Sequence, residues 1–104
     1  MELNVADVPG NNRYEARDEE ANGRVVAFAD YILTSGLITF THTEVEPEYE
    51  GLGVASQLVR DSLDDVRRRG LAVLPVCPFY KGWIQLHPDY VDLLYRKEPS
   101  TSAE

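Results

Sequence analysis

The stretch of sequence that decides the fold runs from residue 42 to residue 55: His42-Thr43-Glu44-Val45-Glu46-Pro47-Glu48-Tyr49-Glu50-Gly51-Leu52-Gly53-Val54-Ala55. Its first residues close a segment rich in β-branched and aromatic side chains, which is typical of a strand. Gly51 and Gly53 then stand directly before a helical pattern. A glycine turn that opens a helix lets the backbone approach a ligand, and the first N–H groups of the helix can bind an anion. By spacing alone, such a pair of glycines is more often only a tight turn.

Downstream of the glycines the sequence predicts a long helix. Apolar residues recur with the helical period from Val54 to Val66. The pattern ends in Arg67-Arg68-Arg69-Gly70, which places cations at the negative end of the helix dipole and a glycine at the C-terminal cap.

A strand and a second helix are predicted after this first helix. Residues 71–76 are apolar enough for a buried strand, and Pro75 favours an edge position because proline cannot donate to a neighbouring strand. Pro78 suits the first turn of a helix over residues 79–86, and a last helical turn is expected around residues 89–95.

Upstream of the glycines the pattern is that of an antiparallel meander with strands at residues 13–18, 24–33 and 37–45. We therefore expect an α/β protein, more closely an α+β fold with a mixed sheet: a meander followed by helix, strand and helix. Residues 13–98 would form a single domain. Residues 1–12 contain Pro9-Gly10-Asn11-Asn12 and are predicted to be flexible, and residues 99–104 are predicted to be a disordered tail.

Charge and composition narrow the classes of function. Ten basic residues stand against eighteen acidic ones, giving a formal net charge of −8. This balance argues against nucleic-acid binding and favours cationic partners. The longest apolar run, residues 25–29, is too short for a membrane span, and no signal peptide opens the chain. A single cysteine, Cys77, excludes an internal disulfide framework and fits the cytoplasm.

The loop resembles the acetyl-CoA-binding motif of the GNAT superfamily of N-acetyltransferases, which reads Gln/Arg-x-x-Gly-x-Gly/Ala. The resemblance is more specific when three segments are taken together: His42-Thr43-Glu44-Val45 with the glycine loop, the helix over residues 58–66, and Cys77-Pro78-Phe79. This combination is similar to a small, single-domain GNAT-like subfamily that carries a cysteine in its site. The likeness covers about residues 15–94.

The resemblance implies a minimal GNAT core that uses acetyl-CoA as acyl donor. The pantetheine arm would run along the strand at residues 37–45, and the pyrophosphate would lie on the glycine loop. The residues implied to bind the coenzyme are Val45, Gly51, Leu52, Gly53, Val54, Ala55 and Ser56.

Two residues depart from the pattern of that family. Glu50 stands where the motif usually has Gln or Arg, and carboxylates beside a phosphate site are unfavourable unless they point away. Arg60 or Lys81 could supply compensating charge. Trp83 stands where this subfamily often has a tyrosine facing the thioester, and Tyr80 is the nearest phenol that could replace it.

Three residues are candidates for catalysis. Cys77 stands where a strand ends and a helix begins, so the helix dipole would stabilise its thiolate; the alternative is a small buried apolar side chain. The two-residue period places His42 and Glu44 on the same strand face as Ile38 and Phe40. If that face lines the cleft, His42 could act as base and Glu44 could orient it; otherwise His42 is a core histidine.

Metal binding is not expected. Cys77, His42 and His87 are too sparse for a zinc site, which needs four ligands at recognisable spacing. His87 is predicted instead to lie at a helix end or in a linker.

Three classes of function remain open from the sequence. The leading one is an N-acetyltransferase that moves an acetyl group from acetyl-CoA to an amine acceptor, for which the acidic charge favours a cationic amine. The second is a non-catalytic protein that binds acetyl-CoA, and the third is a protein-interaction module without CoA. For the enzyme, amine attack could be direct or could pass through an acetyl-cysteine on Cys77. The oligomeric state is left open.

Overall fold

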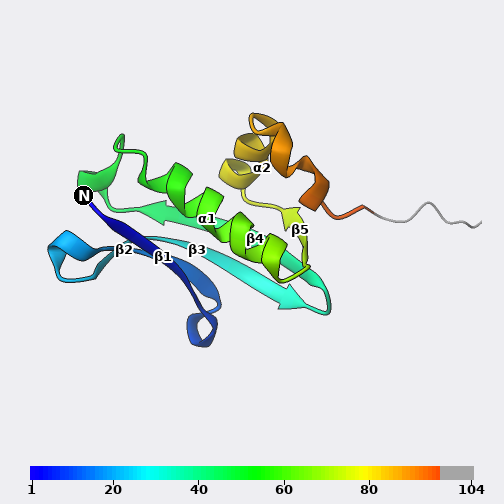
Figure 1. The fold of residues 1–104 in the computed structure, drawn as a ribbon, viewed down its shortest axis with the longest axis horizontal. Coiled ribbons are helices and arrows are strands. Elements are labelled where there is room, and N and C mark those ends of the chain that lie inside the picture. The colour runs from blue at the N-terminus through cyan, green and yellow to red at the C-terminus, as the bar shows by residue number, and fades with distance from the viewer. Residues whose placement is uncertain (97–104) are drawn as a thin grey trace, which may run out of the picture.

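Residues 1–96 are described by a computed structural model, which shows a five-stranded sheet with two α-helices (Figure 1). The strands are β1 (Leu3–Val8), β2 (Arg13–Asp18), β3 (Arg24–Thr34), β4 (Leu37–Val45) and β5 (Ala72–Pro75). The helices are α1 (Val54–Arg68) and α2 (Pro78–Gln85), and short 3₁₀ helices cover Pro9–Asn11, Glu19–Ala21, Pro47–Tyr49 and Pro88–Leu93.

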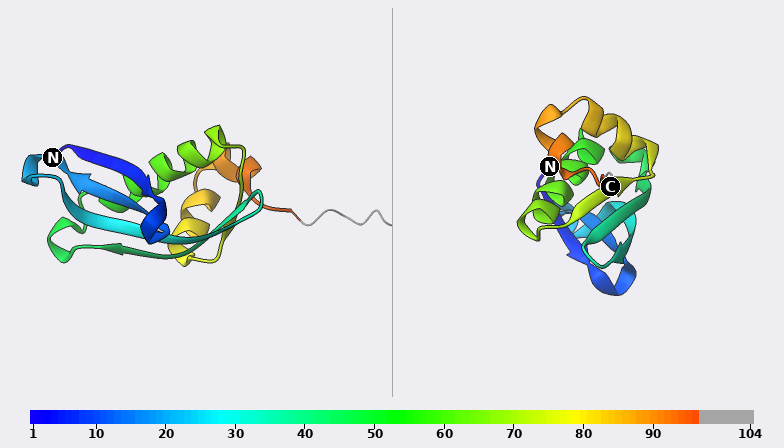
Figure 2. Two further views of the ribbon diagram at one scale, coloured as in Figure 1. Left: turned by 90° about the horizontal axis from the view of Figure 1, so that it is seen from below. Right: turned by 90° about the vertical axis from the view of Figure 1, so that its right-hand side faces the viewer.

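The sheet is mixed. Its strands lie in the order β1-β2-β3-β4-β5, with antiparallel pairing from β1 to β4 and parallel pairing of β4 with β5. The predicted α+β fold, a meander followed by helix, strand and helix, is therefore confirmed. The strands and the helices form two layers when the molecule is seen end on (Figure 2).

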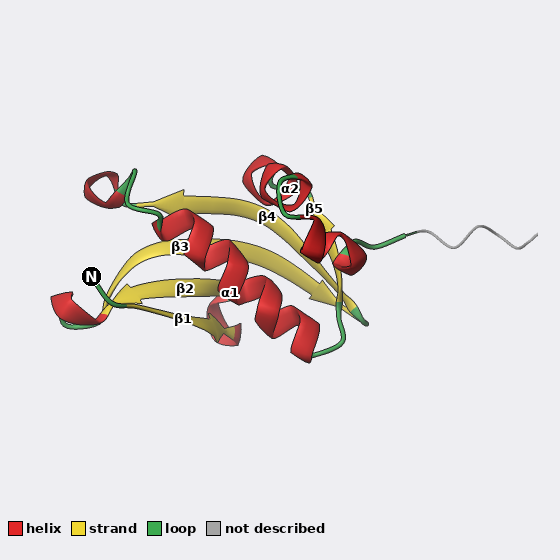
Figure 3. Ribbon diagram, turned by 45° about the horizontal axis from the view of Figure 1, so that its top comes forward, coloured by secondary structure: helices red, strands yellow, loops and turns green. Residues whose placement is uncertain are grey.

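The core lies between these two layers. Helix α1 runs across the sheet (Figure 3). It buries the apolar side chains that the helical period predicted, among them Leu58 and Leu63. From α2, the ring of Tyr80 stacks on the ring of Phe40 in β4, with 4.1 Å between their centroids. The face of the sheet that carries Phe40 is called the inner face from here on, and the opposite face is called the outer face.

The N-terminal segment is not the flexible extension that its turn residues predicted. Leu3–Val8 forms β1, which pairs along its whole length with β2, and Leu3 and Val5 pack against the core. Asp7 accepts hydrogen bonds from Tyr31 and from Arg69, which ties β1 to β3 and to the end of α1. The turn signal at residues 9–12 instead marks the connection between β1 and β2. The predicted tail at residues 99–104 lies outside the described residues.

A β-bulge in β4 changes which side chains reach the inner face. Tyr31 of β3 pairs with Phe40, but the preceding residue Asp30 pairs with His42, so Thr41 is one extra residue in β4. An extra residue shifts the alternation of side chains by one position. Ile38 and Phe40 are buried on the inner face, whereas His42 and Glu44 are exposed.

Strand β4 also extends beyond its parallel neighbour. The pairing with β5 ends at Phe40 and Pro75, and within residues 1–96 no strand pairs with that side of residues 41–45. The predicted edge position of Pro75 is confirmed, because β5 is the last strand of the sheet. The result is an open backbone edge on β4, directly before the glycine loop.

Candidate functional site

The glycine loop forms the N-terminus of α1. Gly51 and Gly53 have φ angles of 80° and 82°, in the left-handed region that glycine adopts without steric cost. Gly53 is the N-cap residue, and no side chain caps the helix. The N–H groups of the first turn are therefore free to bind a ligand, and the helix dipole favours an anion there.

A cleft of about 440 Å³ lies against this loop. Most of the residues implied to bind the coenzyme line it, namely Val45, Gly51, Gly53, Val54, Ala55 and Ser56. Leu52 does not line the cleft, and its side chain is exposed. Thr43, Tyr49 and Phe79 line the cleft as well and were not among the residues implied to bind the coenzyme. Thr43 lies in the strand along which the pantetheine was expected to run, but the face to which its side chain points depends on the bulge at Thr41.

The cleft is poor in positive charge. None of its lining residues is a lysine or an arginine, and Glu50 places a carboxylate at its wall. Arg60 and Lys81, which the sequence suggested as sources of compensating charge, do not line the cleft. Arg24 forms ion pairs with Glu46 at 3.1 Å and Glu48 at 3.0 Å.

Tyr49 is held at the cleft by Asp18 of β2. Its hydroxyl donates a hydrogen bond of 2.7 Å to the Asp18 carboxylate. That hydrogen bond lowers the pKa of Asp18 and raises the pKa of Tyr49, because the phenol O–H stabilises the charged carboxylate and loses this bond when it ionises. The phenol is thus neutral and fixed at neutral pH, and serves as a wall of the cleft.

Cys77 is the N-cap residue of α2 and is buried, with 4% of its surface exposed. Its backbone N–H donates to the carbonyl of Phe40 at 2.8 Å, which joins the start of α2 to the point where β4 and β5 separate. Its Sγ lies 3.3 Å from Oγ1 of Thr43. The thiol therefore faces the side of β4 that carries the cleft residues Thr43 and Val45.

His42 and Glu44 lie on the outer face. Nε2 of His42 is 2.9 Å from Oε2 of Glu44, so the structure confirms that the two side chains are neighbours. The expectation that they share a face with Phe40 is wrong, because the extra residue Thr41 reverses the alternation. The imidazole lies 6.2 Å from the ring of Phe28 on β3, centroid to centroid. His42 and the thiol of Cys77 consequently approach β4 from opposite faces.

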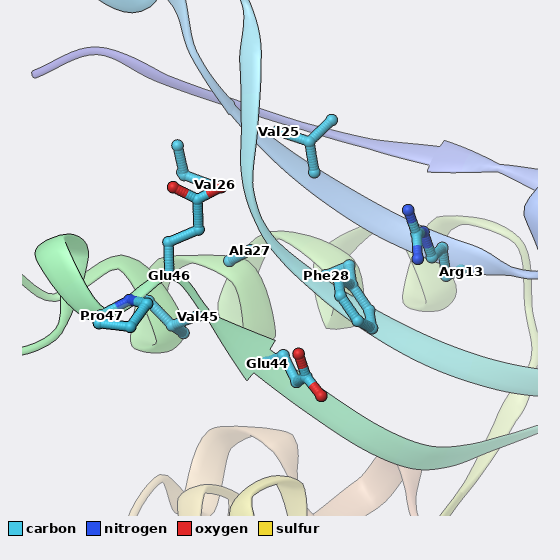
Figure 4. Close-up of a pocket in the computed structure, with 9 residues that line it drawn as sticks. All are labelled: Arg13, Val25, Val26, Ala27, Phe28, Glu44, Val45, Glu46 and Pro47. Carbon is cyan, nitrogen blue, oxygen red and sulfur yellow. The ribbon is translucent and has the colours of Figure 1, made fainter.

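A second cavity of about 380 Å³ lies beside Glu44 (Figure 4). Phe28, Glu44 and Glu46 line it, and Val45 lines both this cavity and the glycine-loop cleft. The guanidinium of Arg13 lies over the Phe28 ring, 4.2 Å from its centroid. Strand β4 is thus the wall between two cavities, one on each face of the sheet.

The aromatic residues of α2 serve the packing of the helix. The Tyr80 hydroxyl lies 2.7 Å from Oγ of Ser62 inside the core, and burial raises the pKa of this phenol far above its ordinary value. Tyr80 is therefore not a substitute acid in the cleft. Trp83 is buried, and its indole N–H donates to Oγ of Ser56 at 2.9 Å. His87 lies just beyond the end of α2 at Gln85, and its ring stacks on Trp83.

Neither a metal-binding cluster nor a membrane-spanning helix is found within residues 1–96. This part of the chain contains no group of three or more His, Cys, Asp or Glu side chains arranged to hold a metal ion. Its helices are also too short or too polar to cross a lipid bilayer.

Solved structures with the same fold are N-acetyltransferase-like proteins. The solution structure of a GCN5-like protein from Staphylococcus aureus superposes with a TM-score of 0.66 at 23% identity, covering 98% of this chain and 97% of that one. The ribosomal-protein-S18-alanine N-acetyltransferase from Escherichia coli gives 0.57 at 23%, with 74% of this chain and 49% of that one covered. An acetyltransferase from Trypanosoma brucei gives 0.50 at 18%, covering 86% and 66%.

These likenesses establish the fold, and a sequence profile establishes the family. The profile described as GCN5-related N-acetyl-transferase matches residues 13–93. A search of curated protein sequences finds no match. The chain belongs to the family of GCN5-related N-acetyltransferases, and its class of activity is acyl transfer. The resemblance drawn from the glycine loop is thereby confirmed at the level of the family.

Proposed function

We propose that this protein transfers an acetyl group from acetyl-CoA to an amine. The observation that carries the proposal is the uncapped N-terminus of α1, with Gly51 and Gly53 in the left-handed region, placed directly after the open edge of β4. These two features suit the two ends of the coenzyme. The helix N-terminus would bind the pyrophosphate, and an unpaired strand edge can bind an extended chain that contains amides, as pantetheine does.

In this proposal the pantetheine arm runs along residues 41–45 of β4, with Val45 and Thr43 beside it. The thioester would then lie near the point where β4 and β5 separate, close to Cys77. Free backbone N–H groups on the open edge of β4 would stabilise the oxyanion that forms as the amine attacks.

The amine acceptor is proposed to approach from the outer face. His42 would accept the proton that the amine loses, and Glu44, 2.9 Å away, would orient the imidazole and stabilise its charged form. The nitrogen forms a bond to the acetyl carbon, the carbon–sulfur bond breaks, and CoA leaves as the thiolate, which then takes up the proton held by His42 or one from solvent. Glu44 and Glu46 line the cavity on this face and would attract an ammonium group, whereas the ring of Phe28 is already covered by the guanidinium of Arg13, which lines the same cavity.

Cys77 is proposed to line the acyl pocket. An acetyl-cysteine route needs a base beside the thiol, and the polar neighbour of Sγ is the hydroxyl of Thr43, while His42 lies on the opposite face. The positions of Cys77, Thr43 and His42 therefore fit direct attack of the amine on the thioester better than they fit an acetyl-cysteine intermediate.

The binding step is tested by isothermal titration calorimetry with acetyl-CoA, CoA and free acetate. We expect saturable binding of both coenzyme forms and none of acetate. Acetyl-CoA at one hundred times its Kd should add about 2.7 kcal/mol to the free energy of unfolding. Absence of binding at millimolar concentration would contradict the proposal.

The catalytic step is tested with a panel of amines and with intact-mass analysis. We expect Cys77→Ala to retain most of the transferase activity, and His42→Ala to lower kcat by roughly 10²-fold because the base is lost. Incubation with acetyl-CoA alone should leave the Cys77 peptide unmodified. A stable acetyl group on that peptide, together with loss of activity in Cys77→Ser, would instead establish the covalent route.

A further inference from the structure

The contact between Trp83 and Ser56 joins the two helices at the cleft. Trp83 is the one tryptophan of the sequence, lies in α2, and is 5% exposed. Its indole N–H donates a hydrogen bond of 2.9 Å to Oγ of Ser56. Ser56 is in the first turn of α1 and lines the glycine-loop cleft.

The indole is held firmly in its direction. The imidazole of His87 stacks on it with 3.7 Å between ring centroids and 10° between ring planes, and Nδ1 of His87 lies 2.7 Å from the carbonyl oxygen of Trp83. The ring of Tyr90 packs edge-on against the indole, and its hydroxyl donates to Asp64 of α1 at 2.8 Å. The N–H of Trp83 is therefore aimed at Ser56 by its surroundings.

The hydroxyl proton of Ser56 is left without an acceptor. The indole is a donor only, so Ser56 must accept in this bond, and its own O–H remains available. Within residues 1–96 no carbonyl, carboxylate or hydroxyl accepts a hydrogen bond from Ser56. The other serine of the helix behaves differently, because Oγ of Ser62 donates to the carbonyl of Val59 at 2.9 Å. An unused donor at the wall of an open cleft is suited to a ligand that accepts hydrogen bonds.

We propose that Trp83 is a positioning residue for the phosphate end of the donor substrate: it occupies a lone pair of Ser56 and so directs the Ser56 O–H to the pyrophosphate. This inference rests on the proposed function, since it deepens the assignment of CoA to the cleft. The cleft contains no lysine or arginine among its lining residues, so each neutral donor carries a larger share of the recognition of the phosphates.

The role of Trp83 also accounts for a residue that departs from the family pattern. The family resemblance places Trp83 where a tyrosine would face the thioester, but its indole N–H reaches the first turn of α1 instead. In this proposal Trp83 positions a hydrogen-bond donor at the phosphate end of the cleft and does not act as an acid at the thioester.

The first test compares CoA with S-acetyl-pantetheine, which has the same arm but no phosphates. Trp83→Phe keeps an aromatic ring and removes the N–H. We expect it to weaken the affinity for CoA by about three- to tenfold and to change the affinity for S-acetyl-pantetheine by less than about twofold. Ser56→Ala should have the same selective effect, and the double variant should be no worse than Ser56→Ala alone, because both changes remove one hydrogen-bond chain.

Ser62→Ala is the matched control, because Ser62 lies in the same helix but does not line the cleft. It should leave the ratio of the two affinities unchanged. A purely structural role of Trp83 would lower both affinities together, and that result would overturn the proposal. Ser56→Ala retains the buried indole. If its ratio of CoA affinity to S-acetyl-pantetheine affinity equals that of the wild type, the proposal is overturned as well.

The second test uses the single indole N–H signal in a ¹H–¹⁵N correlation spectrum. Addition of CoA to the wild type should move this signal, because an anion on the Ser56 O–H strengthens the indole bond. S-acetyl-pantetheine should move it much less, and in Ser56→Ala the two ligands should have the same small effect. An unchanged indole signal in a wild-type sample that calorimetry shows to be saturated with CoA would overturn the role of Trp83 alone. A wild type that does not bind CoA would overturn the proposed function itself.

Discussion

Glu50 is the carboxylate at the wall of the glycine-loop cleft. No ion pair or side-chain hydrogen bond joins it to another residue of the described part of the chain. A fixed negative charge there opposes the binding of a pyrophosphate, whereas the helix N-terminus of α1 favours it. The affinity for CoA is thus expected to reflect two opposing electrostatic contributions.

Glu50→Gln should therefore tighten the binding of CoA by about two- to fivefold, because one repulsive charge is removed at nearly constant volume. Glu48→Gln is the control, since Glu48 is exposed, forms an ion pair with Arg24 and does not line the cleft. The measurement is calorimetry at low ionic strength. Weaker binding in Glu50→Gln would mean that Glu50 contacts the coenzyme favourably.

Glu15 is the buried carboxylate of the outer face. It is 3% exposed and forms ion pairs of 2.9 Å with both Arg13 and Arg17. Burial raises the pKa of Glu15, but the hydrogen bonds from Arg13 and Asn11 and the positive charges of Arg13 and Arg17 together outweigh burial, so its pKa is lower than the ordinary value of 4.5. A depressed pKa in the folded state means that the ionised group stabilises the fold.

Glu15→Gln should lower the free energy of unfolding by about 1–3 kcal/mol near neutral pH. The contribution is present above the unfolded-state pKa near 4.5 and is lost as the pH falls through the lower folded-state pKa. The difference between wild type and variant should accordingly vanish in acid. Urea denaturation at a series of pH values measures it, with the exposed Glu19→Gln as control; a difference that does not depend on pH would contradict this account.

At the scale of elements, the two helices use glycine for different reasons. Gly53 is in the left-handed region at the start of α1, whereas Gly82 lies within α2 and has no positive φ. A Cβ would meet no heavy atom within 4 Å at either position. Any difference between substitutions at the two sites must therefore come from the backbone and not from steric clashes.

Gly53→Ala should destabilise the fold by about 1–2 kcal/mol, because alanine is strained in the left-handed region. It should also weaken CoA binding, since the direction of the first N–H groups of α1 changes. Gly82→Ala should stabilise the fold by about 0.5–1 kcal/mol, because alanine is the better helix former. Thermal unfolding with and without CoA measures both effects. Equal stability of the two variants would show that the φ of Gly53 is not a constraint.

At the scale of the whole molecule, the net charge of −8 is expected to act on the two proposed substrates in opposite directions. It repels the anionic coenzyme and attracts a cationic amine, and salt screens both effects. Raising the ionic strength from about 0.02 to about 0.2 M should lower kcat/KM for a cationic amine by about two- to fivefold. A neutral aromatic amine should show no such decrease. The same salt dependence for both amines would contradict the preference for a cationic acceptor.

The sequence alone predicted the order of the elements from β2 onward and the location of the glycine loop. Three local features predicted the helices correctly: the period of the apolar residues in α1, the glycines before it, and Pro78 at the start of α2. They predict correctly because they depend on backbone preferences of neighbouring residues and not on distant contacts. The glycine-loop motif on which the family resemblance rested is also local, since it lies within one strand–loop–helix unit.

Only the tertiary structure decided which side chains share the site. Turn residues in the first twelve positions could not reveal β1, because an edge strand owes its stability to its pairing partner β2 and to contacts such as Asp7 with Arg69. The extra residue Thr41 in β4 is likewise visible only from the pairing with β3, and it moved His42 and Glu44 to the outer face while turning Thr43 toward Cys77. The physical reason is that strand register and the positions of bulges depend on hydrogen bonds between strands that are distant in the sequence, and a local sequence pattern does not specify these bonds.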